Sequence, residues 1–237
     1  MKKIFALLLA VLMLAAMLTS CEKTGKGPPA EETVPPTEGL LYYWVPQDGT
    51  CAASVGAAKD VEHIVIPPDN MGTVVTQIAS HGFENATNLV SITMPDTVTR
   101  ICVCAFWGCT NLKDIKIPES VLYIEGSAFA HCTSLTSIAI PNGVTIIDVD
   151  VFGGCSSLES IIIPRDVTSI GGSAFSGCNR LNTVYYGGTA SEWDEISIET
   201  IGNDFLTNAA RYYYSATEPA EVGNWWHYDE NGNPVAW

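Results

Sequence analysis

Four consecutive copies of a 23-residue repeat occupy residues 89–180, and no insertion interrupts them. Nine positions keep their residue type in every copy. In the first copy these positions are Leu89, Ile92, Met94, Pro95, Val98, Ile101, Ala105, Phe106 and Cys109. One copy cannot bury its own apolar residues, so consecutive copies must stack and share a core. The repeat therefore predicts a solenoid of stacked coils.

Each copy also predicts its own local structure. Ile92 and Met94 lie two residues apart, so their side chains point to the same face of a strand. Pro95 then ends the strand, because proline has no N–H to donate to a neighbouring strand. The valine and isoleucine that follow line the returning chain, and residues 103–109 are expected to form a helical or 3₁₀ turn that directs Phe106 into the core. The coils then build a parallel sheet over a continuous core.

The array continues in degraded form beyond both ends of the four copies. Upstream, a match requires an insertion of about five residues after Pro67, and downstream a fifth match begins at Leu181 and diverges at Gly187. Strand-like residues on both sides of Pro46–Gly49 predict a hairpin that would cover the open first coil. The expected segments are an N-terminal capping hairpin at 40–62, the repeat array at 63–188, a C-terminal cap at 189–214 and an aromatic appendage at 215–237.

The N-terminus has the features of an export signal. Two lysines precede an apolar stretch at residues 4–17, which is short of the roughly 20 residues that span a membrane. The tetrapeptide that ends at Cys21 resembles a bacterial lipobox, in which the cysteine carries a lipid. We therefore expect a lipoprotein signal peptide at 1–20, lipidation of Cys21 and a lipid-anchored, proline-rich linker at 21–39. The alternative is an ordinary signal peptide followed by a chance cysteine.

The charge of the chain excludes one class of partner. Removal of residues 1–20 leaves 9 of the 11 Lys+Arg against 26 Asp+Glu, so the net charge moves from −15 to about −17. An acidic surface repels phosphate backbones and anionic lipid heads. We therefore expect no nucleic-acid binding, and membrane contact only through the N-terminal lipid.

The seven cysteines that follow Cys21 divide into a repeated group of four and three others. Cys109, Cys132, Cys155 and Cys178 should stack about 4.8 Å apart, and a straight column cannot surround a tetrahedral metal ion. The preceding degenerate copy has alanine in this slot, which favours a small buried packing group. Pairing or thiol reactivity stays open for the other three, which are Cys51, Cys102 and Cys104.

The repeats resemble a known family. Residues 135–144 and 170–178 are similar to the BspA-type leucine-rich repeats of bacterial surface proteins, with the isoleucine–proline pair and the alanine–phenylalanine-to-cysteine spacing. The resemblance covers about residues 60–214 and implies a leucine-rich-repeat solenoid, exported and displayed on the surface for adhesion. It implies no catalytic residues. Four residues depart from the pattern, all in the equivalent turn of the repeat. They are Cys102 and Cys104 in the first copy and Asp148 and Asp150 in the third.

The residues themselves offer no catalytic constellation. The histidines have no metal-ligand spacing, and neither a Gly-x-Ser-x-Gly motif nor a Ser/His/Asp order is visible. His131 stands in a variable slot, where solvent exposure is expected. We predict a protein that is not an enzyme and that binds no cofactor and no metal.

Outward-facing columns of the stacked coils are the candidate binding surface. The candidate ligand-binding residues are Lys116, Tyr123, Ile146, Ile162, Tyr185 and Tyr186. We expect the last three to be exposed and to carry most of the contact energy, as aromatic anchors usually do. The predicted function is adhesion-type binding of a protein or glycan at the cell surface by a monomer. The alternative is a passive envelope spacer with no ligand.

The C-terminal segment supports a further alternative. Residues 228–237 predict a hairpin around Asn231-Gly232, loosely similar to one cell-wall-binding aromatic repeat. Such modules bind carbohydrate between neighbouring copies, and this chain has a single copy. A packed terminal appendage is therefore favoured over a carbohydrate site.

Overall fold

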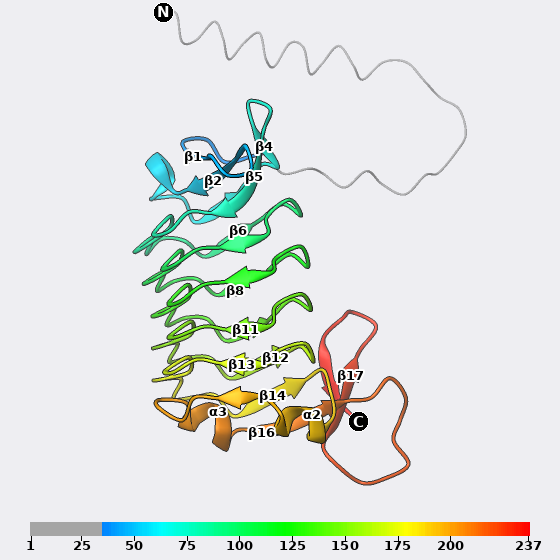
Figure 1. Cartoon of the computed structure of the whole chain (residues 1–237). Coiled ribbons are helices and arrows are strands. Elements are labelled where there is room, and N and C mark those ends of the chain that lie inside the picture. The colour runs from blue at the N-terminus through cyan, green and yellow to red at the C-terminus, as the bar shows by residue number, and fades with distance from the viewer. Residues whose placement is uncertain (1–34) are drawn as a thin grey trace, which may run out of the picture. The chain divides into compact units, whose positions relative to one another are not determined.

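The computed structural model describes residues 35–237, which form one compact unit. The expected signal peptide, Cys21 and most of the linker lie outside the described residues. Coil after coil stacks along one direction, with the N-terminal coils at one end and the C-terminal helices at the other (Figure 1). The predicted leucine-rich-repeat solenoid is confirmed.

The strand of the Leu-x-x-Ile-x-Ile segment builds one wall, here called sheet I. Neighbouring strands are parallel and in register, so Ile138 lies beside Ile161 and Ile161 beside Val184. The strands of sheet I are β3 (His63–Val65), β6 (Ser91–Thr93), β8 (Asp114–Ile115), β10 (Ser137–Ala139), β12 (Ser160–Ile163), β14 (Thr183–Tyr186) and β16 (Ala210–Tyr214). Strand pairing runs from β3 to β8 and from β10 to β16, and it is interrupted between β8 and β10.

The returning chain builds a second parallel wall, sheet II, from shorter strands. The proline of each coil ends the sheet I strand, and two to six residues then pair in sheet II. These strands are β5 (Thr73–Ile78), β7 (Arg100–Ile101), β9 (Tyr123–Ile124), β11 (Ile146–Ile147), β13 (Ser169–Ile170) and β15 (Ser197–Ile198). Strand pairing runs from β5 to β9 and from β11 to β15, and it is interrupted between β9 and β11.

The turn that closes each coil is not helical, contrary to the expectation for residues 103–109. Alternate N–H groups donate to the next coil instead of along the chain: Phe106 N–H donates to the carbonyl of Ala128 at 2.8 Å, and Phe129 N–H to that of Val151 at 2.9 Å. Two residues per turn adopt the left-handed conformation, which breaks any helical ladder. They occupy two slots spaced by 23 residues: His81, Cys104, Ser127, Asp150 and Ser173 in the first, and Asn85, Gly108, His131, Gly154 and Gly177 in the second.

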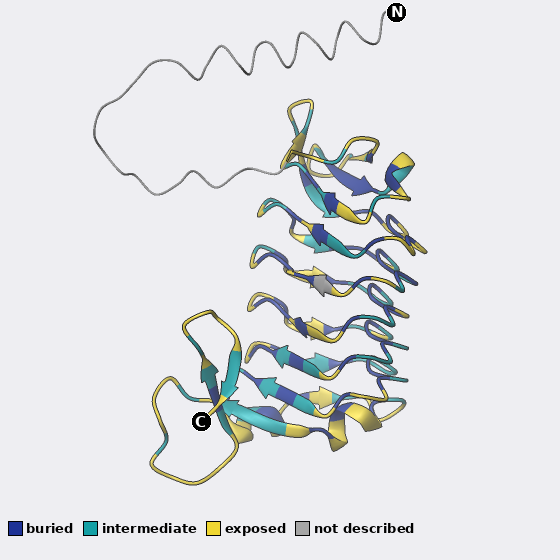
Figure 2. Ribbon diagram, turned by 180° about the vertical axis from the view of Figure 1, so that it is seen from behind, coloured by how far each residue is buried: buried dark blue, intermediate teal, exposed yellow. Residues whose placement is uncertain are grey.

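The core between the walls consists of repeated columns. The phenylalanine rings stack coil on coil with centroids 5.3 to 5.8 Å apart, from Phe83 through Phe129 to Phe175. Each of these rings is fully buried. Figure 2 shows that buried residues recur in coil after coil along the stack. Dispersion contacts and apolar burial along these columns hold the coils together.

The cysteine column is part of this core and also bonds the coils. Each thiol donates a hydrogen bond to the phenylalanine carbonyl of the preceding coil, as Cys132 Sγ does to Phe106 O at 3.2 Å and Cys155 Sγ to Phe129 O at 3.1 Å. Cys109 and Cys178 make the same contact at 3.0 and 3.2 Å. Packing was the predicted role, and the structure adds a weak donor to it.

The N-terminal end is covered by strands that extend sheet II. β1 (Leu41–Val45) pairs antiparallel with β2 (Thr50–Ser54), and β2 continues sheet II beside β5. The 3₁₀ helix η1 (Gly56–Ala58) follows. The predicted insertion after Pro67 is confirmed, because β3 pairs with β6 at a spacing of 28 residues whereas β5 pairs with β7 at 23. The extra residues form the short hairpin of β4 (Asp69–Asn70) with β5.

The C-terminal end is a modified coil that carries two short helices. α2 (Ala190–Asp194) begins with a capping box between Thr189 and Glu192, and α3 (Asp204–Asn208) takes the place of the usual turn. The side chain of Asn203 ends the series of hydrogen bonds that join the turns of successive coils. Its Oδ1 accepts from Phe175 N–H at 3.1 Å, and its Nδ2 donates to Gly171 O and Glu199 O. The amide oxygen replaces the carbonyl that a further coil would have supplied.

Candidate ligand-binding cleft

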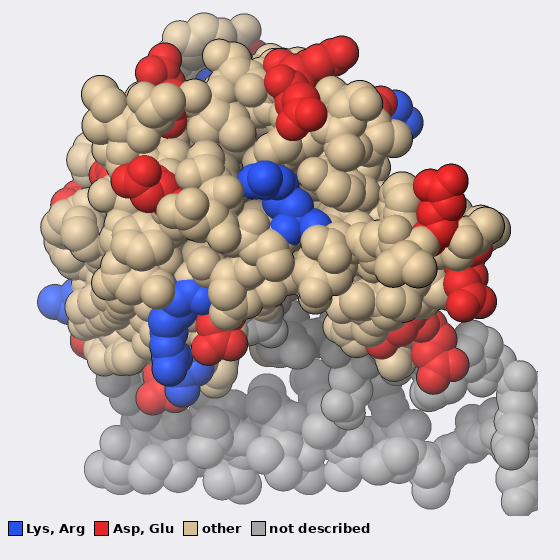
Figure 3. Space-filling model, turned by 90° about the horizontal axis from the view of Figure 1, so that it is seen from below, with Lys and Arg blue, Asp and Glu red and all other residues tan. Residues whose placement is uncertain are grey.

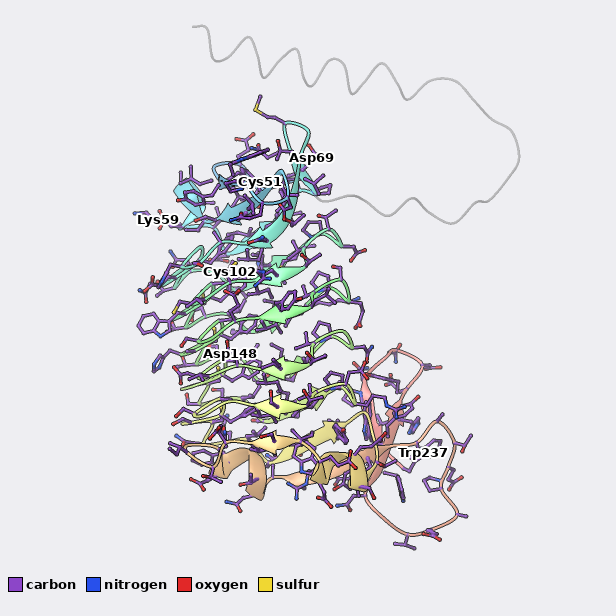
Figure 4. The ribbon with its side chains drawn as sticks, viewed as in Figure 1. Cys51, Lys59, Asp69, Cys102, Asp148 and Trp237 are labelled. Carbon is purple, nitrogen blue, oxygen red and sulfur yellow. The ribbon has the colours of Figure 1, made fainter. Side chains whose placement is uncertain are left out.

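A hairpin at the C-terminus, built from β17 (Trp225–Tyr228) and β18 (Pro234–Ala236), continues sheet I. β17 runs parallel to β16, with Tyr213 beside Trp225 and Tyr214 beside Trp226. β18 pairs antiparallel with β17. The loop between them is held by Asp229, whose carboxylate accepts from Asn231 N–H and Asn233 N–H at 2.9 and 2.8 Å. In Figure 4 the labelled Trp237 lies at this hairpin, beside the last coils.

Trp226 fastens the hairpin to the outward side of sheet I. Its side chain is 1% exposed, and its ring lies 5.5 Å from Tyr185 and 5.2 Å from Tyr214 between centroids. Its Nε1 donates to the backbone carbonyl of Tyr186 at 2.8 Å. A buried indole that satisfies its N–H in this way is a strong anchor. The appendage is therefore packed against the array, as the sequence favours.

A cleft of about 180 Å³ lies between the hairpin and the outward column of sheet I. Ala139 and Ile162 form its apolar floor. Tyr214, Trp226 and Tyr228 form an aromatic wall, and Glu119 and Asn142 form a polar rim. The lining is completed by Ile140, Pro164 and Gly187. Concavity, an apolar floor and a few polar groups are the usual features of a binding site.

A second hollow of about 310 Å³ adjoins the first. It shares Ala139 and Ile162 as lining residues and adds Ser137, Tyr185 and Pro234. The outward column is thus hollowed on both sides of the hairpin. This arrangement gives the C-terminal half of sheet I a deeper surface than a plain solenoid wall.

The electrostatics of the cleft centre on Glu119. Its Oε2 accepts from the backbone N–H of Asn142 at 3.2 Å and from Asn142 Nδ2 at 3.1 Å. Burial raises the pKa of Tyr228, and the Glu119 carboxylate raises that pKa further because it disfavours a second negative charge nearby. The carboxylate and the phenol therefore face the same space.

The six predicted binding residues do not form one surface. Lys116, Ile162 and Tyr185 belong to the outward column of sheet I. Ile162 and Tyr185 are half-buried and not exposed as expected, because the C-terminal strands pack beside them, and both line the hollows beside the hairpin. Tyr123 and Ile146 lie on sheet II, more than half exposed, beside a shallow hollow of about 120 Å³. Two walls of the solenoid are thus involved.

The expected exposure of Tyr186 is wrong. It is 1% exposed, its ring packs edge-on against Trp193 at 5.2 Å, and its hydroxyl donates to Arg165 O at 3.3 Å. Successive residues of a strand point to opposite faces, and Tyr185 already takes the outward direction. Tyr186 is therefore a core residue of the last coils.

Of the six predicted binding residues, only Ile162 lines this cleft. The prediction missed Glu119, Asn142 and Tyr214, and it included Trp226 and Tyr228 only as part of the aromatic C-terminal segment. Glu119 and Asn142 directly follow the proline that recurs in each copy. This slot reads Asp96, Glu119, Asn142 and Arg165 along the array. This variation was a usable signal. The position of Tyr214 depends on how the C-terminal segment folds back, for which the repeat provides no template.

The hollow beside α2 is a poor candidate for the binding site. It measures about 540 Å³, with Arg165, Glu192 and Glu195 among its lining residues. Arg165 and Glu192 already pair with each other at 2.5 Å. Its charged groups therefore stabilise the C-terminal coil.

The seven cysteines of residues 35–237 are all free thiols. In Figure 4, Cys51 and Cys102 lie in separate coils near the N-terminal end. Burial raises the pKa of Cys109 and Cys178 to about 12 and that of Cys102 to about 11. Such thiols stay protonated near neutral pH, so they are poor nucleophiles.

Metal and histidine chemistry find no support in the described part of the chain. No group of three His, Cys, Asp or Glu residues in it is placed to hold a metal ion. His131 is exposed, as the sequence predicts, and its ring makes an edge contact with Trp107 at 5.3 Å.

The fold and the cleft define a leucine-rich-repeat solenoid with an aromatic hairpin folded onto one wall. Residues 76–204 match the BspA type leucine-rich repeat region in six copies, and the chain belongs to this family. Proteins of this family are cell-surface proteins, their repeats generally act as interaction modules, and the family suggests a binding or adhesion role.

Solved structures show the same architecture. The T. pallidum leucine-rich repeat protein TpLRR is 31% identical, with a TM-score of 0.60 over 64% of this chain and 70% of that chain. A leucine-rich cell surface protein from Faecalibacterium prausnitzii is 36% identical, with a TM-score of 0.61 over 71% of this chain and 43% of that chain. The pneumococcal vaccine antigen PcpA shares the fold at 19% identity, with a TM-score of 0.56 over 74% and 43% of the two chains.

This chain thus spans less than half of the Faecalibacterium and pneumococcal proteins. No curated protein matches the sequence. Within residues 35–237, no helix has the length and apolar character needed to cross a membrane.

Proposed function

We propose that this chain is a non-enzymatic cell-surface protein, lipid-anchored through Cys21, that binds a protein or glycan partner in the cleft between sheet I and the C-terminal hairpin. The observation that carries the proposal is the cleft itself. Three aromatic side chains face an apolar floor there, and two of them, Tyr214 and Tyr228, remain 38% and 47% exposed. Partly exposed aromatic side chains in a concave site are typical anchors of binding energy.

The cleft is preferred over sheet II because of its aromatic lining and its preorganisation. Trp226 is locked by its hydrogen bond to Tyr186 and by ring contacts on several sides, so the aromatic wall is fixed before any ligand arrives. A preformed site avoids the entropic cost of ordering its side chains on binding. Lys116 lies further along the same outward column and would contact a partner longer than the cleft.

Binding to protein and glycan arrays tests the proposal. The full chain should bind a reproducible set of ligands, and Tyr228→Ala should weaken that binding at least about tenfold, as the loss of an anchor side chain does. Tyr123→Ala is the matched control, because Tyr123 is an equally exposed tyrosine on the other wall. Binding lost in Tyr123→Ala and kept in Tyr228→Ala would assign the ligand to sheet II instead. Silence across both arrays would support a passive spacer.

The anchor is tested separately by cell fractionation. Cys21→Ala should release the protein from the membrane fraction, while Cys51→Ala should leave it there. A Cys21→Ala protein that still sediments with membranes would refute lipid anchoring.

A further inference from the structure

The aromatic rings of the cleft are steeply inclined to one another, so they do not form a flat platform. The rings of Trp226 and Tyr228 lie 4.9 Å apart at 76°, and those of Tyr214 and Trp226 lie 5.2 Å apart at 69°. A sugar ring stacks best on a flat aromatic surface that it can cover. Trp226 is 1% exposed, because the neighbouring rings cover it. Tyr214 and Tyr228 are 38% and 47% exposed, line the cleft, and hold their rings 6.2 Å apart at 51°. This geometry suits a cation, which is attracted to the face of each ring within about 6 Å.

A carboxylate completes the same enclosure. Glu119 lines the cleft together with the three rings, and Asn142 holds its carboxylate in place through two hydrogen bonds. The four ion pairs found within residues 35–237 use Glu84, Glu125, Glu159 and Glu192 as their acids. No lysine or arginine of this part of the chain lines the cleft. The negative charge of Glu119 is therefore oriented toward the cleft without a cationic partner from the described residues.

The surroundings add to this negative potential. Residues 215–237 contain Glu218, Glu221, Asp229 and Glu230 and neither lysine nor arginine. In the view onto the C-terminal end, one side of the surface carries acidic groups with no basic group among them, whereas the few basic groups lie elsewhere (Figure 3). An acidic surface attracts positively charged partners and speeds their association.

The size of the cleft limits what can enter it. About 180 Å³ holds one long side chain and leaves no room for a folded element. Lysine and arginine have a flexible apolar stem that can lie on Ala139 and Ile162 while the charged end meets the rings and the carboxylate.

We propose that the aromatic cleft receives a lysine or arginine side chain of a basic protein segment, with Glu119 as the charge partner and Tyr214 and Tyr228, both packed against Trp226, as the cation–π partners. This inference rests on the proposed function, because it assigns a partner class to the same cleft. It selects a protein partner over a glycan and does not depend on sheet II.

Fluorescence anisotropy with two labelled peptides tests it. The full chain should bind an alternating Lys-Gly dodecapeptide and not the matching Gln-Gly dodecapeptide. Glu119→Gln and Tyr228→Leu should each weaken binding about fivefold to thirtyfold, which corresponds to about 1–2 kcal/mol of cation–π or ion-pair energy. Thermal melting of both variants should match the parent chain, since both side chains are exposed.

Glu221→Gln is the matched control, since it removes one negative charge from residues 215–237 at an exposed position outside the cleft. An equal loss in Glu119→Gln and Glu221→Gln would reduce the effect to general charge attraction and overturn the inference. A neutral oligosaccharide whose binding depends on Tyr228 and not on Glu119 would also overturn it, while the proposed function would stand. If no array ligand and neither peptide bound, the inference and the proposed function would fail together.

Discussion

The inward and outward columns of sheet I come from the same strands and differ sharply. Inward, the slot that begins at Ile92 reads Ile115, Ile138, Ile161 and Val184, and each side chain is buried. Outward, the next slot reads Thr93, Lys116, Ala139, Ile162 and Tyr185, and every coil has a different residue. An inward side chain must fit the coil below and the coil above, whereas an outward side chain has no such constraint. Stability therefore belongs to the repeated slots, and the variable slots are free to differ from coil to coil.

Phe129→Ala should produce the largest effect, because it removes a ring stacked between two others, at 5.3 and 5.8 Å. We expect the free energy of unfolding to fall by about 3–5 kcal/mol, from lost burial and the cavity left behind. Chemical denaturation at neutral pH measures it, with Tyr123→Ala as the outward control. Similar losses in the two variants would contradict the contrast between inward and outward columns.

Asn203→Ala should come next. Asn203 is 1% exposed, and its side chain satisfies Phe175 N–H, Gly171 O and Glu199 O. The loss of these bonds in a buried site should cost about 1–3 kcal/mol of unfolding free energy. Asn208→Ala is the control at an exposed position of the same cap. An unchanged denaturation midpoint in Asn203→Ala would show that the coil end needs no side-chain acceptor.

The buried cysteine column should make the unfolding free energy depend on pH, which gives a further test of the inward columns. The pKa of Cys109 rises from 9.0 to about 12 in the folded chain, because burial penalises the thiolate. A raised folded pKa means that the stabilising contribution is fully present below pH 9 and is lost as the pH rises toward 12. Each pH unit in that window should lower the unfolding free energy by about 1.4 kcal/mol for this thiol.

Denaturation of Cys109→Ala across that pH window measures this contribution. The variant should show a shallower loss of stability than the parent chain. Cys104→Ala, at a partly exposed position, should change the slope less. Identical slopes for Cys109→Ala and the parent chain would show that the thiol titrates as if exposed.

Arg100→Ala should have the smallest effect. Arg100 pairs with Glu125 at 2.5 Å and lies 4.3 Å over the ring of Tyr123, on the solvent side of sheet II. Both charged side chains are about one-third exposed, so solvent screens the pair. We expect a loss below about 1 kcal/mol in the unfolding free energy. A loss as large as that of Phe129→Ala would mean that this outward position is structural.

Particular residues show how far the sequence could be read. The inward columns were predictable because one 23-residue pattern, repeated without gaps, leaves a single register for stacking. The burial of Tyr186 was also predictable, since it occupies the slot of Ile140 and Ile163 and must point inward when Tyr185 points outward. The turn conformation carried a weaker signal, in the glycines of its second left-handed slot at 108, 154 and 177.

The cleft was beyond the repeat pattern. Glu119 and Tyr228 line the same cleft although more than a hundred residues separate them in the sequence. Their proximity depends on how the chain returns after Tyr214 to pair β17 with β16. No copy of the repeat contains that return. The burial of Trp226, which fixes the hairpin, follows from contacts that exist only after the whole stack has formed.

The fixed distance between the hairpin and its polar rim has an evolutionary consequence. The hairpin contacts the slot after the proline in particular coils counted back from the C-terminus, at present Glu119 and Asn142. A tandem duplication of residues 120–142 would move Glu119 out of reach and place a second copy of Asn142 there. Deletion of residues 97–119 would bring in Asp96 and keep the rim acidic. Gain or loss of one coil could thus exchange the partner without a single substitution in the hairpin.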